Sequence, residues 1–168
     1  MRATTEARIF PVRTAGDLAT TARLFEAYAA SLNVDLCFQD FAGELATLPG
    51  KYAPPAGELL LARGGDGEAL GCAALRPLVA SEVCELKRLY VLPVARGLGL
   101  GRALLDAVLR VAERIGYREV RLDTLPSMAE ALELYRRAGF APIAPYYHNP
   151  IAGSVFLGRR LASSPDEA

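Results

Sequence analysis

Residues 96–108 read RGLGLGRALLDAV, and the interpretation of the whole chain depends on this stretch. The glycines at 97, 99 and 101 stand at alternate positions just before an apolar pattern typical of a helix. Backbone N–H groups at a helix N-terminus attract phosphate oxygens, and glycine has no Cβ to keep a phosphate away. Arg96 and Arg102 flank the turn and add positive charge. The stretch predicts a phosphate site, although a glycine turn that merely redirects the chain is the alternative.

On both sides of this turn the pattern alternates between strands and helices. Before it, we expect a strand at 7–13, a helix capped by Thr14, a shorter helix within 38–48, and strands at 58–63, 70–78 and 82–92. After it, a helix ends near Gly116, a strand covers 118–125, and Ser127 with Glu130 predicts a capping box for a helix ending at Gly139. A loop and a strand complete the chain within 142–161. The order predicts antiparallel strands first and a strand–helix–strand crossover at the centre.

Composition limits the kinds of protein that fit. The 168 residues suit one domain, with a core at about 7–161 and a flexible tail at 162–168. Lys plus Arg and Asp plus Glu both number 19, which argues against a polybasic surface for nucleic acid or acidic lipid. No stretch resembles a signal peptide or a membrane span. The three cysteines, at 37, 72 and 84, form no CxxC pair, so we expect buried, reduced thiols in a cytoplasmic protein.

Two nucleotide-binding motifs do not fit the turn. A Walker P-loop needs Gly-Lys-Ser/Thr at the end of the turn, but Gly101 is followed by Arg102 and Ala103. A dinucleotide-binding turn would find a ribose-binding acid at Asp123, but Arg102 occupies its third glycine position. Residues 93–96 also separate the strand from the first glycine, where a dinucleotide turn is tight. Both motifs are therefore disfavoured.

The stretch LYVLPVARGLGLGRALL resembles the acyl-CoA-binding motif of the GNAT N-acetyltransferases, in which Arg or Gln is followed by x-x-Gly-x-Gly or Ala. Here Arg96, Gly99 and Gly101 occupy those positions. A second family signature matches MAEALELYRRAGF through Ala131, Leu134, Tyr135, Gly139 and Phe140. The resemblance implies a single GNAT-like α/β domain: a mixed central sheet with antiparallel N-terminal strands, a β-α-β crossover carrying the pyrophosphate turn, and flanking helices.

The resemblance also implies acetyl-CoA as cosubstrate and no metal. Its pyrophosphate is expected on the glycine turn, and its pantetheine arm beside the backbone of Leu89 and Val91. The cofactor-binding residues implied by the resemblance are Leu89, Val91, Arg96, Gly97, Gly99, Gly101 and Arg102. Met128 stands where many relatives carry an Asn that contacts the cofactor, so that contact is not carried over.

Two residues are candidates for catalysis. Tyr135 matches the family's general acid, which protonates the departing thiolate; a core aromatic residue is the alternative. Glu85 lies where some relatives place a catalytic glutamate, and the alternative is a surface carboxylate paired with Lys87 or Arg88. With a single histidine, His148, and no credible Cys/His pair, we expect direct acetyl transfer without a covalent enzyme intermediate.

The acceptor site is expected near the first two helices and the C-terminal loop. Tyr52, Tyr146 and Tyr147 are candidates for its lining, with loop aromatics on the surface as the alternative. Arg88 is a candidate clamp for an acceptor carboxylate, or a solvated strand arginine. Asp123 is a candidate anchor for an amine, or a cap for the following turn.

These features favour an N-acetyltransferase that acts on the primary amine of a small amino-acid-like metabolite. The alternatives are a protein N-terminal or lysine acetyltransferase, and a non-catalytic acetyl-CoA-binding sensor. We expect a small-molecule partner and no binding to nucleic acid or membrane. A homodimer is possible.

Overall fold

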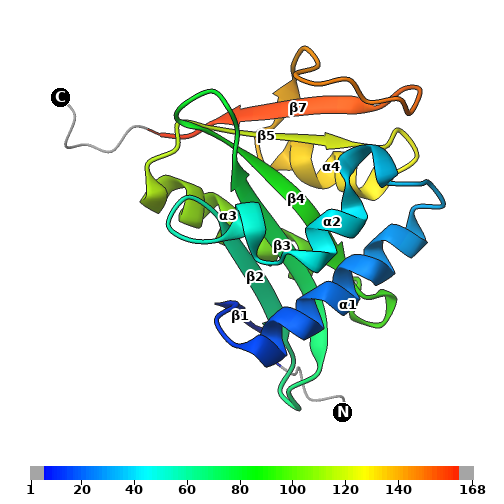
Figure 1. The fold of residues 1–168 in the computed structure, drawn as a ribbon, viewed down its shortest axis with the longest axis vertical. Helices are drawn as coiled ribbons and strands as arrows, with labels where there is room; N and C mark the ends of the chain where they lie inside the picture. Colours follow the sequence, from blue (N-terminus) through cyan, green and yellow to red (C-terminus); the bar gives the residue numbers. More distant parts are fainter. Residues whose placement is uncertain (1–5, 163–168) are drawn as a thin grey trace.

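One mixed sheet organises residues 6–162, the part of the chain described by the computed structural model (Figure 1). Its strand order is β1-β2-β3-β4-β5-β7-β6, and its one parallel pair within these residues is β4 with β5. The strands are β1 Arg8–Pro11, β2 Glu58–Arg63, β3 Ala69–Pro77, β4 Val83–Val91, β5 Glu119–Thr124, β6 Ala141–Pro142 and β7 Val155–Arg160. The helices are α1 Ala15–Ser31, α2 Phe41–Ala46, α3 Leu100–Ile115 and α4 Ala129–Arg137, with short 3-10 turns η1 Cys37–Gln39, η2 Gly50–Tyr52 and η3 Pro93–Ala95.

Helices cover both faces of the sheet, and each face buries its own apolar core. Figure 1 shows α1 and α2 on one face and α3 on the opposite face. Phe25 of α1 packs with Leu59, Leu61 and Cys72 of the sheet. On the other face, Leu104 and other apolar residues of α3 pack against the alternate residues of the same strands. This division follows the two-residue period of side chains along a strand.

The parallel pair β4–β5 is short, and this opens the sheet. Pairing extends only from Val83 opposite Glu119 to Glu85 opposite Arg121. Both strands continue beyond that point, β4 as far as Val91 and β5 as far as Thr124. The far ends of the two strands are therefore free of each other.

A bulge interrupts β4 at Arg88. Cys72 of β3 lies opposite Tyr90, but Ala74 lies opposite Lys87, so one β3 residue faces two residues of β4. Arg88 takes a φ of 58°, the left-handed region that costs a non-glycine residue about 1–2 kcal/mol. Residues an even number apart share a face of a regular strand, yet Leu86 and Tyr90 belong to opposite cores. The bulge thus reverses which residues of β4 face α1 and α2.

The predicted mixed α/β architecture, with antiparallel strands before a β-α-β crossover, is confirmed. The capping box is not: α4 begins at Ala129, its cap is Met128 with no side-chain hydrogen bond, and Ser127 lines a surface groove instead. Cys72 and Cys84 are buried as predicted, whereas Cys37 is exposed. Most of the predicted tail lies outside the described residues, and none of the helices within residues 6–162 is long and apolar enough to cross a membrane.

Gly71 tests how closely β3 and β4 fit under α3. A Cβ at this position would lie 2.6 Å from the Tyr90 carbonyl oxygen and 3.1 Å from Leu104 Cδ1. Because the backbone oxygen cannot move away cheaply, Gly71→Ala is expected to lower the free energy of unfolding by about 1–3 kcal/mol in urea titration. Gly16→Ala is the matched control, since its Cβ meets only Thr14 Oγ1 at 4.0 Å. Wild-type stability in Gly71→Ala would contradict the packing described here.

Candidate active site

A groove of about 610 Å³ runs from the free end of β4 to the N-terminus of α3. Residues of α4 form its other wall, among them Ala131 and Leu134. All seven residues expected to bind the cofactor line this one groove: Leu89, Val91, Arg96, Gly97, Gly99, Gly101 and Arg102. The fold therefore places the residues of the glycine motif and of the preceding strand in a single groove.

The glycine turn has the geometry of an anion site. Gly97 and Gly99 have φ values of 83° and 76°, a region that L side chains rarely adopt. Gly99 caps α3 without a side-chain hydrogen bond, and the N–H groups of the first helical turn have no acceptor inside the helix. Those N–H groups and the positive end of the helix dipole suit a pyrophosphate. The turn thus fits the phosphate part of a coenzyme A.

The two arginines of the motif differ in how they are held. Arg96 donates a hydrogen bond from Nε to the Val91 carbonyl oxygen at 3.1 Å. Its guanidinium carbon lies 5.9 Å from the centroid of the Tyr90 ring. Its charge is thereby fixed at the edge of the groove. Arg102 instead pairs with Asp106, one helical turn later, at 3.0 Å on an exposed surface. Arg96 is the better placed of the two to contact a bound phosphate.

A smaller cavity, about 40 Å³, opens where β4 and β5 diverge. It shares four lining residues with the groove: Tyr28, Leu89, Met128 and Tyr135. Tyr135 on α4 is only 7% exposed. Its ring packs edge-on against the ring of Phe140, with 5.8 Å between the two ring centroids. Burial raises the pKa of Tyr135 well above its usual value, so its hydroxyl keeps its proton at neutral pH. The tyrosine is thus a buried core residue with a protonated hydroxyl, and it lines both binding spaces.

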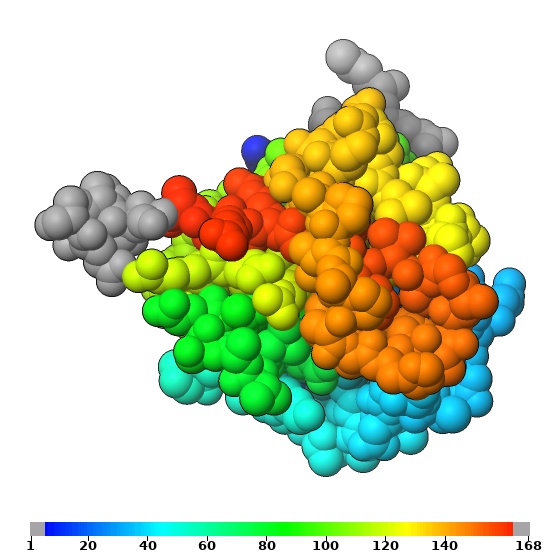
Figure 2. All heavy atoms as spheres, turned by 90° about the horizontal axis from the view of Figure 1, so that it is seen from above, coloured from blue at the N-terminus to red at the C-terminus, as the bar shows by residue number. Residues whose placement is uncertain are grey.

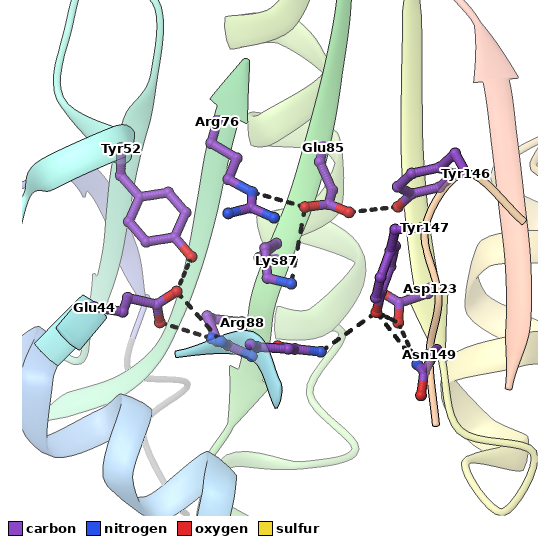
Figure 3. Close-up of polar contacts among 11 residues, drawn as sticks. Glu44, Tyr52, Arg76, Glu85, Lys87, Arg88, Asp123, Tyr146, Tyr147 and Asn149 are labelled. Carbon is purple, nitrogen blue, oxygen red and sulfur yellow. Dashed lines mark hydrogen bonds and ion pairs between the residues drawn. The ribbon is translucent and has the colours of Figure 1, made fainter. Parts of the chain in front are cut away.

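Glu85 is buried completely, which corrects the expected alternative of a surface carboxylate. Its carboxylate accepts hydrogen bonds from Arg76 Nε at 2.8 Å and from the Tyr146 hydroxyl, and Lys87 Nζ lies 3.8 Å away (Figure 3). Arg88 does not contact it; the expected pairing is found with Lys87 alone. Glu85 does not itself line the cavity, whereas Lys87 does.

Arg88 is held by Glu44 of α2. Its Nε and Nη2 atoms contact the two carboxylate oxygens of Glu44 at 2.9 and 3.2 Å, and its guanidinium lies over the Phe41 ring at 5.2 Å. The Tyr52 hydroxyl donates to the same carboxylate at 2.6 Å. Tyr52 therefore lies behind the Arg88–Glu44 pair, in a separate cavity of about 210 Å³, and does not line the space beside Tyr135.

Asp123, at the free end of β5, lines the small cavity. It accepts hydrogen bonds from the Tyr147 hydroxyl and, at 2.9 Å, from Asn149 Nδ2. Tyr147 also accepts a 3.5 Å hydrogen bond from Gln39 of η1. Figure 2 shows the segment between β6 and β7 lying against the region of α1 and α2, which agrees with this contact. Tyr146 and Tyr147 both pack edge-on against Phe156.

Sequence reasoning missed Glu44, Lys87, Tyr28 and Gln39 as site residues. Glu44 and Gln39 lie far from the motifs in the chain, and no local pattern distinguishes them. Lys87 was treated only as a partner for Glu85, because the alternation of a regular strand does not predict the bulge beside it. Among the described residues, no group of three or more His, Cys, Asp or Glu side chains is arranged to hold a metal ion.

Comparisons with known proteins show which family the chain belongs to. The family model of the acetyltransferase (GNAT) family matches residues 23–140. An uncharacterized N-acetyltransferase of Schizosaccharomyces pombe is 42% identical, with 89% of this chain and 91% of that relative covered. An aminoglycoside N(6')-acetyltransferase of Klebsiella aerogenes is 37% identical over 63% of this chain and 74% of its own length.

Among solved structures, a GNAT-family acetyltransferase from Staphylococcus aureus Mu50 superposes with a TM-score of 0.77 at 20% identity. That comparison covers 94% of this chain and all of the other, and at this identity it shows the fold alone. The family model and the relatives identify one family, and the solved structure has the same fold. The chain belongs to the GNAT family of acetyltransferases.

Proposed function

We propose that the protein transfers the acetyl group of acetyl-CoA directly to the primary amine of a small, amino-acid-like acceptor. The observation that carries this proposal is the junction at Tyr135. Tyr135 and Leu89 line both the glycine groove and the small cavity, so a thioester at the end of the groove would meet an amine in the cavity.

The residues of the groove have distinct tasks in this proposal. The first turn of α3 and Arg96 hold the pyrophosphate, and the backbone of Leu89 and Val91 holds the pantetheine arm. When bound, acetyl-CoA supplies an activated thioester. Backbone N–H groups at the free end of β4 are suited to stabilise the negative charge that develops on its carbonyl oxygen during amine attack.

The attacking amine must lose a proton before it can react. Asp123 is the one carboxylate among the described residues that line the small cavity, so we assign it the binding of the ammonium group and the acceptance of that proton. Glu85, the candidate base from the sequence, lies behind Lys87, and its oxygens already bind Arg76 and Tyr146. We assign Glu85 the role of positioning Lys87 and Tyr146.

The cavity supports a small acceptor. Its 40 Å³ corresponds to a few water molecules, a volume that suits the charged end of a small metabolite and not a large acceptor. A polycationic aminoglycoside, named for the Klebsiella relative, would need several carboxylates, but Asp123 alone among the described residues supplies one to this lining. Binding of acetyl-CoA by a non-catalytic sensor would not require a protonated tyrosine at the junction of the groove and the cavity.

Acceptor-dependent release of CoA thiol tests the proposed reaction. The panel contains amino acids, amino-acid amides, polyamines, an aminoglycoside and short peptides, and acetyl-CoA binding is measured separately by calorimetry. Release with small amines supports the proposal. Acetyl-CoA binding without release for any acceptor would contradict the proposed activity and favour a sensor.

Tyr135→Phe tests the proton donor. The variant keeps the buried ring but removes the hydroxyl, so kcat is expected to fall by about 10²–10⁴-fold while the Kd for acetyl-CoA stays near the wild-type value. Tyr117→Phe is the matched control, because its hydroxyl bonds the Ala56 carbonyl oxygen and it lines neither the groove nor the small cavity. An unchanged kcat in Tyr135→Phe would remove this residue from the mechanism.

Gly101→Ala tests the phosphate site. A Cβ at this position would meet Leu134 Cδ2 at 3.7 Å and Val91 Cγ2 at 3.9 Å, which are ordinary contacts. The fold should therefore tolerate the change, whereas a phosphate could no longer approach the helix N-terminus closely. We expect a normal thermal midpoint and a Kd for acetyl-CoA raised about tenfold or more, as for the loss of a charge-assisted hydrogen bond. Wild-type affinity would place the phosphates elsewhere.

A further inference from the structure

Only some of the charged side chains in and beside the small cavity form hydrogen-bonded ion pairs. Arg76 and Glu85 form one hydrogen-bonded ion pair, at 2.8 Å, and Arg88 and Glu44 form a second, bidentate pair at 2.9 and 3.2 Å. Lys87 and Asp123, one positive and one negative, belong to neither hydrogen-bonded pair; Lys87 has only a longer, 3.8 Å ionic contact with Glu85 (Figure 3). Three cations and three carboxylates are thus present, but only two of each are joined by hydrogen bonds.

Lys87 is a buried cation with unused donors. It is 7% exposed, and among the described residues its one ionic contact is Glu85 at 3.8 Å, beyond hydrogen-bond distance. No hydrogen bond from its ammonium group to any described residue is present, although it lines the cavity. The pKa of Lys87 is lowered, mainly by burial and also by the charges of Arg88 and Arg76; the charges of Glu85 and Asp123 oppose this shift without cancelling it. An ammonium in this position lacks an anion that accepts directly from it.

Asp123 is the counterpart on the opposite strand. Tyr147 and Asn149 donate hydrogen bonds to it, but no described cation lies within ion-pair distance of its carboxylate. Lys87 comes from β4 and Asp123 from β5, the two strands that diverge to form the cavity. Besides Arg88, which Glu44 neutralises, the lining therefore presents one positive and one negative group from its two sides.

We propose that Lys87 binds the carboxylate of the acceptor while Asp123 binds its amine, so that the acceptor is a free amino acid. This inference rests on the proposed function and names the acceptor class. A zwitterion leaves the charge balance of the cavity unchanged, whereas a simple amine would add an uncompensated positive charge. The lining also contains apolar side chains, although polar groups make up more of the cavity surface; the apolar ones include Leu32, Leu36, Phe38, Leu125 and Ile151.

The same observations assign the carboxylate to Lys87 and not to Arg88, which the sequence offered as a candidate clamp. Two nitrogens of Arg88 are already directed at Glu44, and releasing them would leave that partly buried carboxylate beside Tyr52 without its cation. A peptide N-terminus has an amide where a free amino acid has its carboxylate. Lys87 therefore also disfavours protein N-termini as acceptors.

The experiment compares each free amino acid with its own carboxamide. Alanine, leucine, methionine and phenylalanine are tested beside their amides in the thiol-release assay, since each pair differs mainly in the negative charge. In the wild type we expect kcat/KM to favour the free acid by about 10- to 100-fold, the scale of a hydrogen bond to a charged group.

Lys87→Met keeps the apolar stem and removes the ammonium group. In this variant kcat/KM for the free acids is expected to fall by about 10- to 100-fold, while the amides react nearly as in the wild type. Lys51→Met is the matched control, because Lys51 is the only other lysine of the chain and is exposed. It should leave both members of each pair unchanged.

The outcomes separate this inference from the proposed function. A wild-type enzyme that acetylates the amides as well as the acids would overturn the inference and leave the acetyltransferase intact. Equal losses for acids and amides in Lys87→Met would assign Lys87 a structural role and also overturn it. If acetyl-CoA binds but no amine of any kind releases thiol, the proposed function fails, and the inference fails with it.

Discussion

A bulge at Arg88, where two residues of β4 lie opposite one residue of β3, determines the geometry of both binding spaces. Without it, the side chains after Leu86 would exchange faces, and Leu89 and Val91 would no longer line the glycine groove. The left-handed backbone at Arg88 is stabilised locally: Glu44 holds the guanidinium, and Cys72 Sγ donates to the Arg88 carbonyl oxygen at 3.3 Å. A helix from the N-terminal part of the chain thus helps to fix the geometry of the central strand.

The bulge also determines the charges of the acceptor side. Lys87 and Arg88 are neighbours in the chain, yet both line the same cavity instead of pointing to opposite faces. Glu44 neutralises one of them, and the other remains available for a ligand. The glycine turn follows the same strand after η3. The bulge in β4 therefore sets how the glycine groove, Tyr135 and the small cavity lie relative to one another.

Much of this molecule could be predicted from local patterns. The groove beside the glycine turn could be predicted because left-handed glycines and a free helix N-terminus lie within a few residues of each other in the chain. The acceptor side was harder. Glu44 and Arg88 meet across 44 residues of sequence, and the burial of Glu85 depends on Tyr146, which lies 61 residues later. The Ser127 cap was wrong because tertiary placement of α4 along the groove outweighed a local capping preference. The roles of Tyr135, Asp123 and Lys87 stay predictions.

Titration of the isotopically labelled protein with acetyl-CoA, followed by amide NMR shifts, tests whether the bulged strand and the glycine turn together form the cofactor site. We predict saturable shifts of the Leu89, Val91, Gly99 and Gly101 amides, with the residues around Tyr52 unaffected. Unmoved amides at the glycine turn and in β4, together with saturable shifts around Tyr52, would contradict this account.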